Sequence, residues 1–431
     1  MSASSGSWSQ PVDPGRAAIA AAVAVAVFVS AWTLLHVGFY RHDQISDTPI
    51  YQRYGNGMAH GHVPYRDFQL EYPPAALPAF VIPSLLRSPG ASRSAYRDAF
   101  EAEMLVCGAV MLAFMLSILV SLEAGLVRIG AALGFAALAP LALGSVVLTR
   151  FDLWPAALTT GAVAAFVAGR QRVGAGVLAV AAGAKLFPAV LVPIAAVWIW
   201  RRRGRREALV CLGVFAAVLA ACFVPFLVLS PHGVWHAVTT QTSRPLQIES
   251  LGAGVLLVAH VVGGLGITMR PSHGSQNLAG GAPDVLAVLQ TVLQAAALIA
   301  TWAWFARGPA TRERLVHASA TAVCAFVVFG KVLSPQFLLW LVPLVPLVRG
   351  RRGVAAAGLL GLALLLTQLW FPYRYWALAL HFDTAASWLV LVRDLVLVAL
   401  FAVLGTVPKG LSLECGGKSH DGAWRAQGQS L

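Results

Sequence analysis

The sequence predicts an all-α protein, a polytopic bundle with roughly 12–14 membrane segments that include short re-entrant or juxtamembrane helices. Three observations support this prediction. The chain is 58% hydrophobic and only 11% charged, whereas a soluble domain carries about 25% charged residues. Apolar runs near the ~20 residues that cross a bilayer recur along the whole chain. The positive charges, which give a net charge of +13, gather in short loops between those runs.

These clusters of arginine follow the positive-inside pattern of membrane proteins, so helix insertion explains them without a nucleic-acid partner. The clusters are Arg170 with Arg172, 201–206, 307–314 and 349–352. The five cysteines form no C-x-x-C pair and no Cys/His ligand spacing. We therefore expect neither disulfides nor a metal site.

The chain divides into three parts by composition. Residues 1–16 are rich in Ser, Gly and Pro, and we expect a disordered cytoplasmic N-terminus there. Residues 17–406 are expected to form one transmembrane domain, and 407–431 a flexible cytoplasmic tail. The first apolar run, 17–39, exceeds the 7–15 residues typical of the apolar region of a signal peptide, so it predicts a retained helix.

The first outer loop, 40–74, is followed by a short, proline-rich apolar segment at 73–86, which either spans the membrane or only dips into it. Later apolar segments are expected at 97–122, 126–148, 153–169, 173–184, 186–200, 207–229, 251–267, 284–306, 314–330, 333–348, 352–370 and 385–406. If Arg87, Arg93 and Arg97 are cytoplasmic, one segment between 73 and 150 has to be re-entrant or split. The segment 251–267 is also expected to be re-entrant.

The loop 40–74 is unusually polar for this chain, because it holds three histidines and four of the 18 acidic residues. Asp43 and Asp47 are one helical turn apart, and so are Asp67 and Glu71. Such pairs serve in acid–base chemistry, bind a divalent ion, or cap helices and pair with nearby arginines. A hydrophobic scaffold with one dense polar loop is typical of a membrane enzyme whose reaction centre lies at the water boundary.

Three further stretches place a cation beside a proline-broken helix end: Thr149 to Pro155, Ala184 to Pro188 and Phe329 to Phe337. A charged side chain within a membrane segment costs at least ~2.5–3.5 kcal/mol, so it needs a reason. A broken helix frees backbone N–H groups, and a neighbouring Lys or Arg then makes an anion site. The alternative is that the lysines reach out to the headgroup layer. The loop charges place all three stretches on the outer face.

The sequence S-D-T-P-I-Y-Q-R-Y-G at 46–55, followed by G-H-V-P-Y-R-D-F-Q-L-E-Y-P-P at 61–74, resembles the first outer loop of glycosyltransferase family 87. These are GT-C-type membrane enzymes that use polyprenyl-phosphate sugars, typically mannose. Four later blocks are similar to that family as well: R-F-D-L-W-P (150–155), A-K-L-F-P-A-V-L-V-P (184–193), R-P-L-Q-I-E-S (244–250) and K-V-L-S-P-Q-F-L-L-W-L-V-P-L (331–344).

The resemblance implies a catalytic Asp in the first outer loop, and the pattern D-x-x-x-Y matches Asp47 with Tyr51, so Asp47 is the expected general base. The donor phosphate is expected to bind Arg150, Lys185, Lys331 and Arg244. Residues expected to bind substrate or shape the loop are Asp43, Tyr51, Tyr65, Asp67, Glu71, Asp152 and Gln336. No cofactor and no metal is expected, because basic side chains neutralise the departing phosphate.

The expected function is transfer of a sugar, most simply mannose, from a polyprenyl-phosphate donor to a hydroxyl of a lipid or glycan acceptor by inverting displacement. The reaction would take place on the periplasmic or extracellular face of a multi-pass cell-membrane protein, in cell-envelope biosynthesis. Two alternatives stay open. One is a transporter or flippase of a lipid-linked sugar, since charges beside broken helices also suit transporters. The other is a GT-C arabinofuranosyltransferase.

Overall fold

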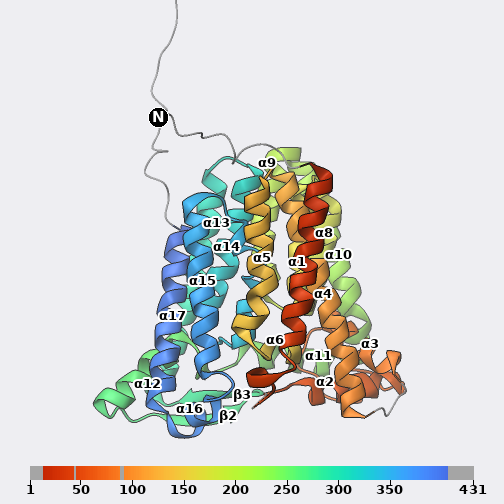
Figure 1. The fold of residues 1–431 in the computed structure, drawn as a ribbon. Coiled ribbons are helices and arrows are strands. Elements are labelled where there is room, and N and C mark those ends of the chain that lie inside the picture. Colours follow the sequence, from red (N-terminus) through yellow and green to blue (C-terminus); the bar gives the residue numbers. More distant parts are fainter. Residues whose placement is uncertain (1–12, 43–44, 88–91, 406–431) are drawn as a thin grey trace, which may run out of the picture.

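The structure, a computed structural model, describes residues 13–42, 45–87 and 92–405. It is a bundle of long, roughly parallel helices with a layer of short elements at one end (Figure 1). Seven helices are long and apolar enough to cross a membrane, namely α1 (Pro14–Leu34), α4 (Arg93–Ser121), α5 (Leu126–Leu143), α10 (Arg205–Leu229), α13 (Gly281–Arg307), α15 (Gly350–Trp370) and α17 (Thr384–Gly405), counted over the described residues. The predicted transmembrane helical bundle is therefore confirmed.

Shorter helices complete the bundle and explain why seven long spans are fewer than the segments expected. They are α7 (Leu153–Val167), α8 (Gln171–Ala184), α9 (Val192–Arg203) and α14 (Arg312–Val328). The segment 333–348, expected as an apolar membrane segment, is buried and contains the 3₁₀ turns η4 (Pro335–Trp340) and η5 (Val345–Leu347) in place of an α-helix. Pro335, Pro343 and Pro346 lack the N–H groups that a continuous α-helix would use.

The predicted arginine clusters all meet at one end of the bundle, which we call the arginine end. Arg172 forms an ion pair with Glu207 at 2.9 Å. Arg201 donates to the carbonyl of Gly308, and Arg202 donates to that of Ala310 at 3.1 Å. These contacts join the loops 170–172, 201–206 and 307–314, as the charge pattern predicts.

The opposite end, which we call the polar end, holds the remaining short elements (Figure 1). They are η1 (Gly38–Arg41), α2 (Thr48–Ala59), η2 (Pro74–Ala76), α3 (Pro78–Leu86), α6 (Val146–Thr149), α11 (Pro231–Thr242), α12 (Leu251–Gly263) and α16 (Tyr375–His381). The turn η3 (Phe187–Leu191) lies inside the bundle, where the carbonyl of Val190 accepts from the Trp302 indole of α13. Residues 251–267 do not cross the bundle, because α12 and the strand after it lie in this layer, as the re-entrant prediction requires.

A small antiparallel sheet at the polar end was not expected from the sequence. Its strands are β1 (Leu246–Gln247), β2 (Thr268–Ser272) and β3 (Ser275–Ala279), in the order β1-β3-β2. Ser272 pairs with Ser275 across a two-residue turn. Both turn residues, His273 and Gly274, have positive φ, of 54° and 65°, as a tight hairpin requires. The segment is too short and too polar to show an alternating pattern.

The segment 73–86 only dips into the polar end. With nine residues, α3 is about 14 Å long, too short to cross a bilayer. It packs on α2, and Arg93 at the start of α4 lines the same surface pocket as Ile50 and Asn56 of α2. The condition that Arg87, Arg93 and Arg97 are cytoplasmic is therefore wrong for Arg93. Because 73–86 returns to the polar end, α4 and α5 cross the bundle and come back, and Arg150 lies at the polar end without a further split segment.

The contact between α2 and α3 gives a stability prediction. A Cβ on Gly55 would lie 2.1 Å from the carbonyl oxygen of Phe80 and 2.5 Å from the Ser84 Oγ. Gly55→Ala should therefore cost about 1–3 kcal/mol of stability, as overpacking does. Gly130→Ala is the matched control, since a Cβ there meets nothing within 4 Å. Thermal unfolding in detergent should show a lower midpoint for Gly55→Ala alone, and equal midpoints would contradict this account of the packing.

Candidate active site

Asp47 and Arg150 form an ion pair at the polar end. Asp47 is the residue before α2, and its backbone carbonyl accepts from the N–H groups of Ile50 and Tyr51. Its side chain makes no cap hydrogen bond within α2, so the carboxylate is left to contact Arg150. The Tyr51 hydroxyl donates to the same carboxylate at 3.4 Å. Burial raises the pKa of Tyr51 well above its ordinary value, so Tyr51 is a neutral hydrogen-bond donor.

An interruption between helices α5 and α6 brings Arg150 to this position. Helix α5 ends at Leu143, and Gly144 takes a φ of +70°. A Cβ on Gly144 would lie 2.1 Å from the Gln368 side chain, so this turn requires glycine. The Thr149 hydroxyl then donates to the carbonyl of Ile45 at 3.3 Å, which ties the segment before Asp47 to α6. Arg150 follows in extended conformation and is 8% exposed.

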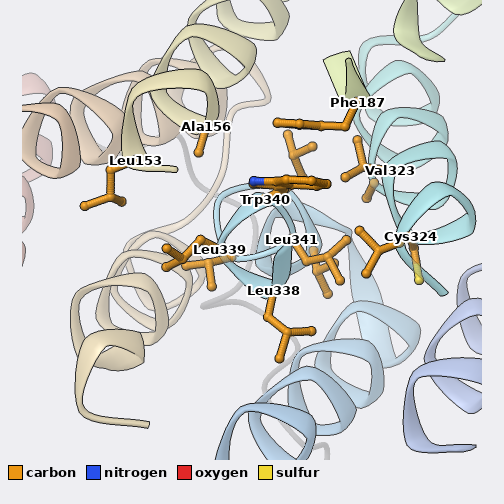
Figure 2. Close-up of a cluster of buried hydrophobic side chains, with 14 of the residues drawn as sticks. Leu153, Ala156, Phe187, Val323, Cys324, Leu338, Leu339, Trp340 and Leu341 are labelled. Carbon is orange, nitrogen blue, oxygen red and sulfur yellow. The ribbon is translucent and has the colours of Figure 1, made fainter. Parts of the chain in front are cut away.

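Asp152 and Lys185 form a second, more deeply buried ion pair. The Lys185 Nζ lies 2.6 Å from the Asp152 Oδ1, and the Trp340 indole donates to the same oxygen at 2.7 Å. Phe187 stacks on Trp340 with ring centroids 4.1 Å apart, inside the cluster of buried hydrophobic side chains in Figure 2. Lys185 also lies 4.8 Å from the centroid of the Phe151 ring, a distance at which a cation is attracted to the ring face.

Of the four cations predicted to bind the donor phosphate, Lys185 lies within electrostatic reach of both Arg150 and Arg244. Burial lowers the pKa of Lys185, the neighbouring Asp152 opposes this, and Arg150 and Arg244 lower the pKa further. Burial also lowers the pKa of Arg150. The fourth, Lys331, donates to the carbonyl of Thr242 at 3.3 Å, and burial lowers its pKa too.

Glu71 and Arg244 lie beside the turn of the small sheet. Their side chains approach to 3.9 Å, and Arg244 donates to the carbonyl of His273 at 2.7 Å. Gln241 of α11 donates to the backbone carbonyl of Glu71 at 3.0 Å. Burial raises the pKa of Glu71, while Arg244 and Lys185 act to lower it. Glu71 is therefore linked electrostatically to the Asp152–Lys185 pair.

The other predicted residues lie around these pairs. Asp67 lies in an exposed turn, where it accepts from the Val63 N–H at 2.7 Å and from Arg66 at 2.8 Å. Tyr65, with a φ of 68°, donates to the carbonyl of Tyr72 at 2.6 Å. Gln336 is half-buried on η4. Asp43 lies outside the described residues.

Two buried carboxylates and an arginine were not singled out from the sequence. Glu249 is 2% exposed, and Arg150 and Arg393 both act on its carboxyl electrostatically. Burial raises the pKa of Glu249 to about 7. Arg393 and Asp394 lie within α17, 0% and 1% exposed, with 2.6 Å between Nε and Oδ1. Arg393 also donates to the backbone carbonyl of Glu249 at 2.7 Å. The sequence feature that could have identified Arg393 and Asp394 is that they are adjacent charges inside an apolar run, where a charge needs a partner or a function.

Several polar atoms around these groups are buried without a hydrogen-bond partner among the described residues. They include Arg150 Nε, Asp152 Oδ2, Gln247 Oε1, Glu249 Oε1, Trp370 Nε1 and Arg393 Nη1. Buried polar atoms are almost always satisfied by protein, water or ligand. These atoms therefore leave hydrogen-bonding capacity for water or a ligand at this end of the bundle. Among the described residues no group of three His, Cys, Asp or Glu side chains is placed to hold a metal ion.

The family model described as glycosyltransferase family 87 matches residues 70–335, which is more than half of the chain. The chain belongs to glycosyltransferase family 87. No curated protein matches the sequence significantly. Among solved structures, the crystal structure of ArnT from Cupriavidus metallidurans bound to undecaprenyl phosphate is similar, with a TM-score of 0.48 and 14% identity. That match covers 91% of this chain and 77% of ArnT.

Membership of family 87 makes this multi-pass membrane protein a glycosyltransferase, and the resemblance stated from the sequence is confirmed. The matched segment includes Glu71, Arg150, Lys185 and Glu249, and it begins after Asp47. The family match therefore does not cover Asp47. What connects Asp47 to the matched segment is its ion pair with Arg150.

The buried pair in α17 gives a prediction. Arg393→Ala leaves Asp394 as a buried charge without its partner and removes the donor to Glu249, so it should cost about 3–5 kcal/mol of stability. The double substitution Arg393→Met with Asp394→Leu should recover much of this loss, since an apolar pair of similar volume needs no compensation. Thermal unfolding in detergent measures both variants. A double variant as unstable as Arg393→Ala would show that the pairing is not the source of the loss.

Proposed function

We propose that this family 87 glycosyltransferase transfers a sugar, with mannose as the leading candidate, from a polyprenyl-phosphate donor to a hydroxyl of a lipid or glycan acceptor. The observation that carries the proposal is the ion pair between Asp47 and Arg150, surrounded by further buried charges at one end of a membrane bundle. A carboxylate is the base such a transfer needs, and the cations suit the phosphate that departs.

In the proposed step, the Asp47 carboxylate takes the proton of the acceptor hydroxyl. The oxygen of that hydroxyl forms a bond to the anomeric carbon, while the bond between this carbon and the phosphate oxygen breaks. The electron pair leaves with the lipid phosphate. Attack from the face opposite the phosphate inverts the configuration at the anomeric carbon.

Arg150 has two roles in this scheme, because it contacts Asp47 and is the cation nearest to the base. When the guanidinium of Arg150 binds the donor phosphate in place of Asp47, the Asp47 carboxylate becomes free to act as a base. Lys185 lies within electrostatic reach of both Arg150 and Arg244, so these cations can share the negative charge of the phosphate. No cofactor or metal is needed, since these side chains supply the positive charge. The arginine end is cytoplasmic by the positive-inside pattern, which puts the site on the outer face.

Substitution of the base tests the proposal. Asp47→Asn keeps the size of the side chain and removes its basicity, so transfer should fall by about 10²–10⁴-fold while the protein stays folded. The matched control is Asp98→Asn, since Asp98 is an exposed residue of α4 with no role in the proposed reaction. Transfer is measured with the purified protein, total membrane lipid and radiolabelled polyprenyl-phosphate mannose or arabinofuranose, which also identifies the sugar. Full transfer by Asp47→Asn would remove Asp47 as the base.

Substitution of Arg150 tests the phosphate role separately. Arg150→Gln removes the charge that stabilises the departing phosphate, so kcat should fall by about 10²–10³-fold. Arg66→Gln is the control, since Arg66 is a half-exposed arginine in the surface turn with Asp67. Donor KM and kcat are measured at saturating acceptor. An unchanged kcat for Arg150→Gln would exclude its contact with the leaving group.

A further inference from the structure

A groove with a volume of about 470 Å³ lies at the polar end, next to the proposed reaction centre. Four separate stretches of the chain form its walls: α2, the segment 68–71, α11 and the turn between β2 and β3. Its size lies within the range of small-molecule sites, which is about 300–1,000 Å³. None of the residues expected to bind phosphate lines it.

The walls of the groove combine aromatic rings with hydrogen-bonding groups. Tyr54 and Phe68 stack with ring centroids 5.9 Å apart and an interplanar angle of 16°. His236 and Thr240 of α11 and His273 of the turn add polar groups. The Nδ1 of His273 is buried without a hydrogen-bond partner among the described residues. Flat apolar faces beside side chains that donate and accept suit a ring that carries hydroxyl groups.

Glu71 also lines the groove and connects it to the proposed reaction centre. Its carboxylate is 3.9 Å from Arg244, too far for a hydrogen bond, so its oxygens are available to accept from hydroxyl groups. Lys185 acts on Glu71 electrostatically from the reaction-centre side.

We propose that this groove binds the hydroxylated headgroup of the acceptor, a sugar or polyol, and directs one of its hydroxyls towards Asp47. The inference depends on the proposed function, since it assigns the second substrate of the same reaction. It also sets the class of the acceptor substrate. The end of the acceptor that carries the reacting hydroxyl is polar and enters the groove from the aqueous layer, whichever lipid anchors the acceptor.

The test fills the groove without touching the charges. Thr240→Trp places a large ring in the groove, and Val238→Trp, on the exposed side of the same helix, is the matched control. The acceptor KM should rise at least about tenfold in Thr240→Trp and stay within about twofold in Val238→Trp. Slow hydrolysis of the polyprenyl-phosphate sugar by water should persist in both. Unchanged transfer by Thr240→Trp would overturn the groove assignment and leave the proposed function standing.

Binding is measured independently of activity by saturation-transfer NMR on the full chain in detergent. The probes are the methyl glycosides of mannose, glucose and galactose, together with myo-inositol and glycerol. At least one probe should receive saturation from the wild-type protein and from Val238→Trp, and lose it with Thr240→Trp. The inference is overturned if no probe binds the wild-type protein, or if Thr240→Trp binds equally well. A wild-type protein that neither transfers nor hydrolyses any donor would instead count against the proposed function.

Discussion

The arginine at position 150 is the charge on which the rest of the polar end depends. It contacts Asp47, and Asp152 and Glu249 both act on it electrostatically. Taking one charge out of water costs several kcal/mol unless partners compensate for it. The elements that carry these three carboxylates therefore have to converge on one point. The loop before α2, the start of α7 and the segment before α12 meet there, although about 200 residues separate the first from the last.

The same constraint explains the aromatic surroundings of Lys185. Phe151, Phe337 and Trp340 each present a ring within 5.4 Å of the ammonium group. These rings exclude water and replace part of its stabilisation of the cation. Trp340 also donates to Asp152, so it fixes both partners of the ion pair. In the proposed reaction, a cation and a carboxylate held in this way would keep their places when a substrate binds, which is the preorganisation that catalysis requires.

Much of the fold follows from local features of the sequence. Long apolar runs predicted α10, α13 and α17 to within a few residues, because a helix that crosses a bilayer satisfies its own backbone. Proline positions predicted that helices end near Arg150, Lys185 and Lys331. The D-x-x-x-Y spacing placed Asp47 and Tyr51 one turn apart, and they are joined by a hydrogen bond. The sheet β1-β3-β2 was missed, since its strands have two to five residues and no clear alternation.

By itself the sequence determined that this is a multi-pass membrane protein of glycosyltransferase family 87, with its polar residues concentrated in one loop and at three helix breaks. Those properties depend on composition and local spacing, which a linear chain displays directly. Only the tertiary structure decided which cation meets which carboxylate. Arg150 pairs with Asp47 and Lys185 with Asp152, while Arg393 holds the backbone of Glu249 from 144 positions away. Such pairings depend on helix packing and burial, and sequence separation carries no information about them.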